Sequence, residues 1–256
     1  MNSFSTDSVD TNPVDIGISS DAGDRVLDHL TQLDSTPAKN LPALIAELAQ
    51  DSVGQTALMQ YLQKRCQVAT PPTTPTADFI AGKIYQTLFQ IHSPVCMDFL
   101  QTCFPTGIVP LRSQKAIDYH PLQILLAKQD FQAADQLTLQ KLCELAGESA
   151  VQRKWIYFTE VEQFPAIDLQ TINALWLVHS DGKFGFSVQR ELWLSLGKNW
   201  DKLWSKIGWK DGNNWTRYPQ GFTWDLSAPK GHLPLSNQLR GVRVIASLMA
   251  HPAWNP

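Results

Sequence analysis

Apolar residues spaced for helices constrain the fold of this chain more than any other feature. Trp200, Leu203, Trp204 and Ile207 recur at i, i+3, i+4 and i+7 and stop at Gly208, which is typical of one face of an amphipathic helix. Similar spacing recurs over residues 26–33, 41–48, 57–62, 80–88, 95–104, 122–126, 131–145, 169–176, 188–196 and 239–248. Short helices joined by short turns predict an all-α fold.

Composition divides the chain into two predicted helical units. All nine Trp lie at or after position 155, and Pro105, Gly107 and Pro110 interrupt the helical spacing between the halves. The start of the chain is acidic and lacks periodicity, so we expect a disordered tail there. The predicted organisation is a disordered acidic tail at 1–22, a small N-terminal helical bundle at 23–104, a linker at 105–118 and a ligand-binding core domain at 119–256.

Helix ends within the core domain are marked by residues that cap backbone groups. Gly147 follows a helical run and is predicted to end it in the C′ position. Ser187 and Asn199 each stand before a helical run and are predicted to be N-caps. Four Trp at helical spacing are interpreted as core residues: Trp176, Trp193, Trp200 and Trp204.

Composition also argues against several classes of protein. The chain has 43% hydrophobic and 18% charged residues, as globular proteins do, and its net charge of −3 argues against a general nucleic-acid binder. No apolar run reaches 18 residues, so no membrane span is predicted. The N-terminal stretch lacks the basic start of a secretion signal, and we expect a cytoplasmic protein. The four Cys show no metal-binding spacing and are expected to be reduced core residues.

One segment, residues 207–232, collects large rings among residues that break helices and strands. Gly, Asn, Asp and Pro surround five aromatic residues and three cations there: Trp209, Trp215, Tyr218, Phe222 and Trp224, with Lys210, Arg217 and Lys230. A loop that leaves such rings in water forgoes roughly 1.5–3 kcal/mol of burial for each. Flat apolar faces beside cations suit a flat, anionic, aromatic ligand. The alternative is an Ω-loop that folds on its own rings.

Positive charge is concentrated around this aromatic segment. Residues 198–243 hold eight Lys or Arg against three Asp. Arg240 and Arg243 are predicted to stand at i and i+3 on the start of the last helix, so that both guanidinium groups point the same way. Such a pair suits a ligand with two carboxylates, because each guanidinium can make a bidentate contact. The alternative is two surface arginines that contribute little energy.

Signals for catalysis are weak. Glu160 and Glu162 are two residues apart, which does not place them on one face of a helix, so a solvated face is favoured over an acid/base pair. The sequence contains no nucleophile elbow, no zinc-protease motif and no P-loop. Residues 182–185 lack the third glycine of a dinucleotide-binding loop. They are interpreted as a tight turn that packs Phe184 and Phe186.

The six His are scattered along the chain. His179 ends a predicted helix, where an imidazolium would interact favourably with the helix dipole, and this role is favoured over metal ligation. His232 lies near the end of the aromatic segment. A hydrogen-bonded loop anchor is favoured for His232, and the alternative is an axial ligand.

Five motifs carry a specific resemblance to a known family. They are Phe-Thr-Glu-Val-Glu-Gln-Phe-Pro-Ala (158–166), Leu-Gln-Thr-Ile-Asn-Ala-Leu-Trp (169–176), Gly-Lys-Phe-Gly-Phe-Ser-Val-Gln (182–189), Ile-Gly-Trp-Lys (207–210) and Leu-Ser-Ala-Pro-Lys-Gly-His-Leu-Pro (226–234). Together they resemble the genomes-uncoupled-four family, porphyrin-binding activators of magnesium chelatase in oxygenic phototrophs. The resemblance covers about residues 118–254. The N-terminal bundle is similar to the extra helical domain of cyanobacterial members.

The resemblance implies an all-α core shaped like a cupped hand, with an apolar palm and mobile loops, that binds protoporphyrin IX and Mg-protoporphyrin IX. It also implies stimulation of magnesium chelatase through the large porphyrin-binding subunit of that enzyme. The flexible ligand loop of the family falls on residues 211–224, its porphyrin-contacting arginines on Arg240 and Arg243, and an apolar palm residue on Phe158. Tyr218 stands where another aromatic residue, often Trp, is expected, and stacking is retained.

The resemblance therefore implies a non-enzymatic tetrapyrrole-binding regulator, and a porphyrin fits the flat ligand with two carboxylates that the aromatic segment and the arginines favour. The predicted porphyrin-binding residues are Phe158, Trp209, Trp215, Arg217, Tyr218, Phe222, Trp224, Arg240 and Arg243. We expect no catalytic residue, no metal site and no prosthetic group, and a cytoplasmic monomer, with peripheral association with thylakoid membranes left open. One alternative is a single-stranded nucleic-acid-binding module, since rings with cations also stack bases. The other is a haem enzyme that uses His232 as axial ligand.

Overall fold

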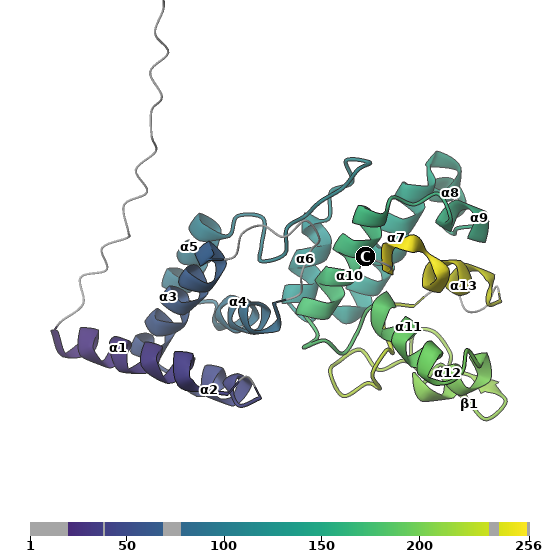
Figure 1. Ribbon diagram of the computed structural model, residues 1–256. Helices are drawn as coiled ribbons and strands as arrows, with labels where there is room; N and C mark the ends of the chain where they lie inside the picture. The colour runs from purple at the N-terminus through teal and green to yellow at the C-terminus, as the bar shows by residue number, and fades with distance from the viewer. Residues whose placement is uncertain (1–19, 38, 69–77, 236–240, 255–256) are drawn as a thin grey trace, which may run out of the picture.

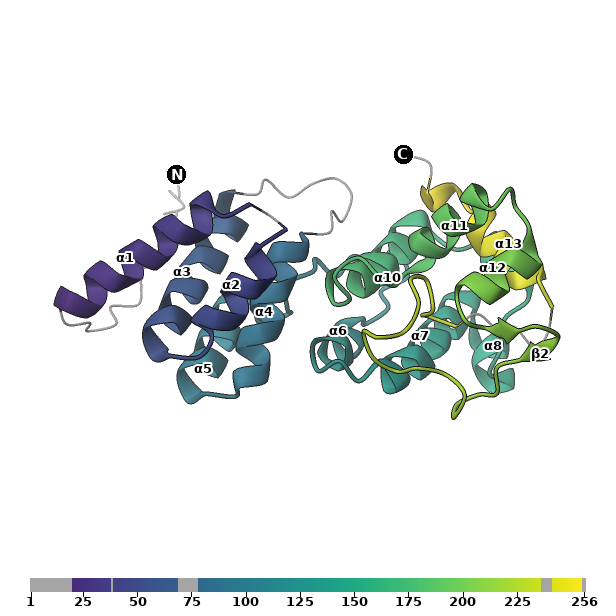
Figure 2. The same ribbon diagram turned by 90° about the horizontal axis from the view of Figure 1, so that it is seen from below.

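The computed structural model describes residues 20–37, 39–68, 78–235 and 241–254. They form a mostly helical molecule with one two-stranded antiparallel sheet (Figures 1 and 2), which confirms the predicted fold class. The elements in chain order are α1 (Ser20–Ser35), α2 (Leu41–Leu48), α3 (Ser52–Val68), α4 (Phe79–Ile91), α5 (Pro94–Cys103), α6 (His120–Ala127), α7 (Phe131–Ala146), α8 (Glu148–Arg153), α9 (Phe158–Val161), α10 (Ala166–Val178), α11 (Phe186–Ser195), α12 (Trp200–Lys206), β1 (Lys210–Asp211), β2 (Asn214–Trp215), α13 (Arg243–Ala250) and η2 (Pro252–Trp254). Within these ranges, no helix is both long and apolar enough to cross a bilayer.

Helices α1 to α5 form the N-terminal bundle around a core of their own. Asp78 caps α4 by accepting hydrogen bonds from Ile80 N and Ala81 N at 3.1 and 3.0 Å. Ser93 caps α5 by accepting from Cys96 N at 3.1 Å. Such caps stabilise a helix by about 1 kcal/mol each. The apolar faces of the five helices meet in one buried cluster that includes Leu33, Ile45, Leu58, Leu62, Ile84 and Leu88.

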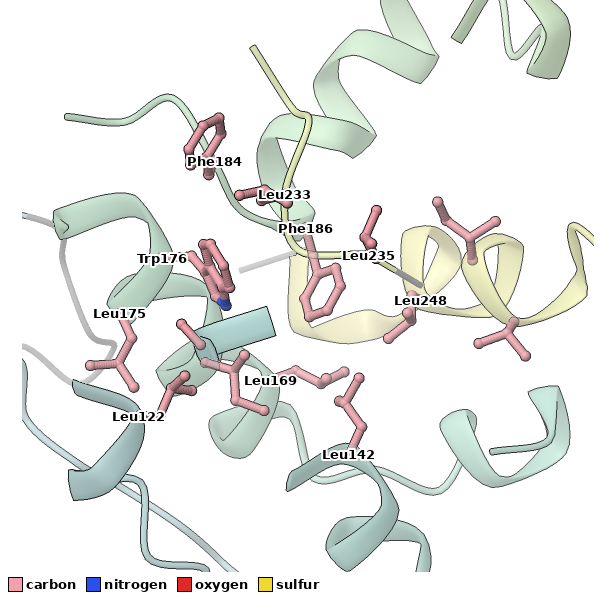
Figure 3. Close-up of a cluster of buried hydrophobic side chains, with 14 of the residues drawn as sticks. Leu122, Leu142, Leu169, Leu175, Trp176, Phe184, Phe186, Leu233, Leu235 and Leu248 are labelled. Atoms are coloured by element: carbon pink, nitrogen blue, oxygen red, sulfur yellow. The ribbon is translucent and has the colours of Figure 1, made fainter. Parts of the chain in front are cut away.

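The C-terminal core is built around α10 (Figure 3). Trp176 of α10 is fully buried, and its ring centroid lies 6.0 Å from that of Phe131 and 6.4 Å from that of Phe184. The indole Nε1 of Trp176 donates to Thr138 Oγ1 at 3.0 Å, so its buried polar atom is satisfied. Phe184 and Phe186 are both buried, as the tight turn at 182–185 predicts. Truncating one such ring to Ala typically costs about 3–5 kcal/mol.

A row of stacked indoles covers one edge of this core. Ring centroids are 4.9 Å apart for Trp193 and Trp200, 5.3 Å for Trp200 and Trp204, and 5.4 Å for Trp204 and Trp209. Trp204 and Trp176 are buried, as their spacing predicts. Trp193 and Trp200 are only half-buried and pack on the outside of the cluster. The row connects α11 and α12 to the start of the aromatic segment.

Helix α4 packs the N-terminal bundle against the core (Figure 2). Gly82 of α4 faces Val178 at the end of α10, and a Cβ at Gly82 would lie 2.8 Å from the Val178 carbonyl oxygen. The amide Nε2 of Gln86 donates to the carbonyl oxygens of Leu126 and His179, at 3.4 and 3.2 Å. Gln86 therefore bonds carbonyl groups at the C-terminal ends of α6 and α10, and the Leu126 carbonyl also accepts from Gln129 N at 3.0 Å.

Several local predictions are confirmed. Residues 105–118 form neither helix nor strand. Gly147 ends α7 with a φ of 108°, a value in the region that favours glycine. Asn199 caps α12 by accepting a hydrogen bond from Lys202 N at 3.0 Å. Of the four Cys, Cys96 and Cys143 are buried as predicted and Cys66 and Cys103 are only half-buried. The exact boundaries of the predicted domains stay a prediction.

Two predicted helix starts are wrong. Helix α1 begins at Ser20, so residues 20–22 of the predicted disordered tail are helical. Residues 1–19 of that tail lie outside the described ranges. Helix α11 begins at Phe186, which places Ser187 inside the helix rather than at its N-cap. The backbone N–H of Ser187 donates to Asn173 Oδ1 at 2.9 Å. A side chain of α10 thus supplies the cap that local sequence assigns to Ser187.

Candidate ligand-binding site

The aromatic segment begins with a small hairpin rather than with irregular chain. Strands β1 and β2 pair Lys210 with Trp215 and Asp211 with Asn214 around a tight turn. The indole of Trp215 is 40% exposed, and Lys210 Nζ lies 5.6 Å from its ring centroid. Past β2, the chain runs across the face formed by α7 before it turns back into the core (Figure 2).

Two of the predicted ligand-contacting rings lie inside the protein. Trp209 is fully buried, stacks on Trp204 with an interplanar angle of 5°, and donates from Nε1 to His232 O at 2.8 Å. Phe222 is 5% exposed, and its ring centroid lies 5.3 Å from that of His232. In this conformation both rings support the aromatic segment from the core side, as the Ω-loop interpretation expects. Their contact with a ligand stays a prediction.

The remaining rings of the segment lie at the surface. Tyr218 is 42% exposed, and its centroid lies 5.8 Å from that of Trp224 in an edge-to-face arrangement. Trp224 is half-buried and donates from Nε1 to Pro219 O at 3.0 Å. Gln136 Nε2 of α7 donates to Tyr218 Oη at 3.1 Å. Arg217 is exposed beside them in the sequence. Tyr218 and Trp224 therefore form a small accessible pair that an exposed hydrogen bond joins to α7.

A cation and a ring meet where α13 crosses α9. Arg243 is the first residue of α13 and is exposed, and its Cζ lies 5.4 Å from the ring centroid of Phe158, the first residue of α9. Phe158 is half-buried against the core. Arg243 and Phe158, both predicted site residues from distant parts of the chain, are therefore brought together. Their contact with a ligand stays a prediction.

The last helix starts later than its predicted range of 239–248. The last helix begins at Arg243, and Gly241 before it has a φ of 87°, which right-handed helices do not contain. Arg240 lies outside the described residues. The pairing of the two arginines therefore falls partly outside the described residues and stays a prediction. Gly241 explains why α13 starts only at Arg243, since a Gly inside a helix costs about 1 kcal/mol.

His232 is a hydrogen-bonded anchor, as favoured from the sequence. Its Nδ1 donates to Ile207 O at 2.6 Å, and its Nε2 accepts from Thr223 N at 3.2 Å. Burial lowers the pKa of His232, so the neutral ring that this pattern requires is favoured. Both nitrogens are bonded to the backbone of the aromatic segment, one at its first residue, Ile207, and one at Thr223. This leaves neither nitrogen free to act as an axial ligand in this conformation.

The role expected for His179 is wrong. Tyr85 of α4 packs over His179 with ring centroids 6.3 Å apart, and His179 is fully buried at the end of α10. Burial lowers the pKa of His179 to about 3, so the ring is neutral and does not interact with the helix dipole as an imidazolium. The contact comes from another domain and has no local sequence signal.

The acidic pair is structural. Glu160 forms an ion pair with Arg153 and accepts a hydrogen bond from Tyr157 N at 2.7 Å, which caps α9. Glu162 is exposed. Among the described residues, no group of His, Cys, Asp or Glu is placed to hold a metal ion.

A buried carboxylate near the site was not singled out from the sequence. Asp135 of α7 is buried, and Asp135 Oδ1 accepts a hydrogen bond from Leu235 N at 2.6 Å. Burial raises the pKa of Asp135 to about 7. Its sequence signal is weak but present, because Asp135 falls on the same helix face as Phe131 and Leu142, where an apolar residue is expected.

Comparison with known proteins assigns this arrangement to a family. Residues 112–252, which contain all the described site residues, match the GUN4-like family. The chain belongs to the GUN4-like family. Residues 18–105 of this GUN4-like chain match the ARM-like repeat domain found at the N-terminus of GUN4 proteins. The resemblance stated from the sequence motifs is thereby confirmed.

Individual relatives agree with this assignment. The GUN4-like chain is 54% identical over 233 residues to the Ycf53-like protein of Synechocystis, a match that covers 89% of this chain and 97% of the relative. It is 37% identical over 150 residues to the chloroplastic tetrapyrrole-binding protein of Arabidopsis thaliana, covering 55% and 57% of the two chains. The solved structure of GUN4 from Chlamydomonas reinhardtii matches with a TM-score of 0.54 and 40% identity, over 58% of this chain and 95% of the other. Ligand-free GUN4 of Arabidopsis thaliana matches with a TM-score of 0.51 and 38% identity, over 55% and 100%.

Proposed function

We propose that this chain is a non-enzymatic regulator that binds a tetrapyrrole, with protoporphyrin IX and Mg-protoporphyrin IX as its ligands. The observation that carries the proposal is the exposed Arg243 guanidinium over the half-buried Phe158 ring, in a chain 37% identical to a protein named for tetrapyrrole binding. A porphyrin offers a flat apolar face to a ring and two propionates to cations. Both kinds of contact are available at this position.

The proposed site combines this pair with the aromatic segment. Trp215, Tyr218 and Trp224 would pack on the macrocycle, because their rings are exposed or half-buried. Arg217 and Arg243 are exposed cations that would bind propionates. Trp209 and Phe222 are assigned to the same site and reach a ligand only when the segment opens. Arg240 is assigned by resemblance alone.

The expected affinity follows from ligand size and from the rearrangement required. A porphyrin has about 40 non-hydrogen atoms, and at about 0.3 kcal/mol per atom the ceiling for binding is roughly −12 kcal/mol. The outer rings exchange contacts with one another for contacts with the macrocycle, which lowers the net gain. We expect a dissociation constant in the micromolar range. No step of chemistry is assigned to the chain: it binds, orients and releases the pigment.

The proposed biological role is stimulation of magnesium chelatase in chlorophyll biosynthesis, through the large porphyrin-binding subunit of that enzyme. A loaded chain would deliver porphyrin or bias the conformation of the chelatase. Residues 23–104 would act as an interaction module or a stability aid, residues 105–118 as a linker, and residues 119–256 as the binding domain. We propose a cytoplasmic monomer, with peripheral contact with thylakoid membranes as a further proposal.

The proposal is tested by two measurements on the full chain. Titration with protoporphyrin IX, its magnesium form and a linear bilin, followed by Trp fluorescence quenching, establishes binding and ligand preference. Addition of the chain to magnesium chelatase should raise the rate of magnesium insertion, and an unchanged rate in the presence of bound porphyrin would contradict the regulatory part. A single-stranded oligonucleotide serves as competitor: tight binding that weakens steeply with salt would favour the nucleic-acid alternative instead.

A further inference from the structure

The short strap formed by residues 231–235 passes through the core just after the aromatic segment and is held along its length. Gln189 Nε2 of α11 donates to the carbonyl oxygens of Gly231 and Pro234, at 3.0 and 2.8 Å. Trp209 Nε1 donates to His232 O at 2.8 Å, and Gly185 N donates to Leu233 O at 3.0 Å. All these bonds reach the strap through its carbonyl groups.

Asp135 bonds the last residue of the strap, and in this bond the strap is the donor, as it also is at its first residue, where Gly231 N donates to Lys183 O at 2.9 Å. Its carboxylate accepts from Leu235 N at 2.6 Å, and both residues are buried. Leu235 belongs to the same buried cluster as Val244 and Leu248 of α13, and Figure 3 shows Leu235 in the region of α13. Arg243 is the first residue of that helix. The Asp135 bond thus fixes the point where the chain leaves the strap, against the helix that carries Arg243.

Asp135 and Gln136 are consecutive residues of α7 that hold the two sides of the proposed site. Gln136 bonds Tyr218 Oη in the aromatic segment, at 3.1 Å and at the surface. The exposed bond is weak, because water competes for both groups. The bond of Asp135 is buried, where an N–H left without an acceptor costs about 1–3 kcal/mol. Only the Asp135 bond is therefore strong enough to fix geometry.

We propose that Asp135 is a positioning residue for tetrapyrrole binding: by accepting the Leu235 N–H, its side chain sets the position of α13 and hence of Arg243 over Phe158. The inference rests on the proposed function. Asp135 does not contact the ligand itself, since it is buried under the strap. A buried carboxyl is expensive in an apolar core unless it is bonded, and here the bond it makes is the one that ends the strap.

The matched variants separate positioning from general stability. Asp135→Asn keeps an oxygen acceptor of the same shape, whereas Asp135→Leu and Asp135→Ala remove the acceptor. Thr138→Val is the control, because Thr138 lies on the same buried face of α7 and accepts the Trp176 Nε1–H, but bonds neither Leu235 nor Tyr218. All variants are compared well below their unfolding midpoints, so that each is folded during the titration.

The test is a protoporphyrin IX titration of the full chain, combined with hydrogen exchange at the Leu235 amide. Asp135→Leu or Asp135→Ala should weaken binding at least tenfold and accelerate exchange at Leu235, while Asp135→Asn stays within about threefold of the wild type in affinity and restores protection. Thr138→Val should lose stability but keep affinity within about twofold. Wild-type affinity in a variant whose Leu235 amide exchanges faster would overturn the inference. A wild-type chain that binds no porphyrin would instead overturn the proposed function, before any variant is compared.

Discussion

The guanidinium of Arg243 lies over the ring of Phe158, with Cζ 5.4 Å from the ring centroid, although the two residues are far apart in the sequence. Each begins a helix, and the two helices cross so that the first residue of α13 meets the first residue of α9. This relationship is the only described place where a predicted site cation meets a predicted apolar palm residue. Its consequences can be measured separately from those of the aromatic segment.

Replacement of Arg243 should weaken tetrapyrrole binding without harming the fold. Arg243 is exposed and its contact with Phe158 contributes about 0.5–1 kcal/mol at most to stability. We expect Arg243→Ala to raise the dissociation constant for protoporphyrin IX several-fold, and Arg243→Lys to recover part of the loss because a charge remains but not the planar fork. Lys206→Ala, an exposed cation on α12, is the control. Equal affinity of Arg243→Ala and the wild type would remove Arg243 from the site.

The ring and the hydroxyl of Tyr218 should have separable effects. Tyr218→Phe removes the exposed hydrogen bond from Gln136 and keeps the ring, so affinity for protoporphyrin IX should change less than about twofold. Tyr218→Ala also removes the stacking surface, worth about 1 kcal/mol, and affinity should fall about fivefold. Fluorescence titration of both variants distinguishes these effects. If Tyr218→Phe weakens binding as much as Tyr218→Ala, the hydroxyl and not the ring is the functional group.

Asp135 and His179 are expected to give opposite pH dependences of stability. Burial raises the pKa of Asp135 from 3.8 to about 7, so the native state holds a proton that the unfolded state releases, and this contribution is lost as pH rises through about 7. Burial lowers the pKa of His179 from 6.5 to about 3, so the unfolded state takes up a proton first, and this contribution is lost as pH falls from 6.5 toward 3. Between about pH 4 and 6.5 the two effects oppose each other.

Replacing either residue alone should therefore reveal the pH dependence of the free energy of unfolding that the other residue contributes. Each group changes the free energy of unfolding by up to about 1.4 kcal/mol per pH unit within that window. Relative to the wild type, Asp135→Asn should gain stability as pH rises from 4.5 to 6, and His179→Leu should lose it. Urea unfolding at a series of pH values measures both. Parallel profiles for the wild type and the two variants would show that neither group titrates as its burial implies.

Gly82 should be required where α4 meets the core. A Cβ at this position would lie 2.8 Å from the Val178 carbonyl oxygen, so Gly82→Ala should destabilise the chain by about 1–3 kcal/mol. Gly23 of α1 has no atom within 4 Å of its added Cβ, and Gly23→Ala should instead stabilise by about 0.5–1 kcal/mol. Thermal unfolding of both variants checks the opposite signs. A neutral Gly82→Ala would mean that the bundle and the core are not closely packed there.

Local signals predicted what local forces decide. The helical spacing of Trp200 to Ile207 and the cap at Asn199 were both predicted correctly, because an amphipathic face and a side-chain cap need only neighbouring residues. Ser187 fails as a cap because Asn173, on another helix, takes the role. His179 fails as a dipole partner because Tyr85 covers it. In both cases a tertiary contact outweighs a local preference.

In the candidate site, too, local features could be predicted and tertiary contacts could not. Large rings among Gly, Asn, Asp and Pro marked the aromatic segment, whose role in binding stays a prediction. The sequence did not separate the buried Trp209 and Phe222 from the exposed Trp215 and Tyr218. The separation depends on the strap and on His232, which hold the segment from the core side. The contact of Arg243 with Phe158 was not predicted, because no spacing rule links α9 to α13.

The most direct test of the account is an absorption titration of protoporphyrin IX with the full chain. Binding between aromatic rings and cations should shift the Soret band, with saturation at one tetrapyrrole per chain and a dissociation constant in the micromolar range. A smaller shift in Arg243→Ala at the same protein concentration, from a dissociation constant raised several-fold, would locate the ligand at the proposed site. An unchanged Soret band at protein concentrations up to about 100 times the expected dissociation constant, with the chain folded, would contradict tetrapyrrole binding.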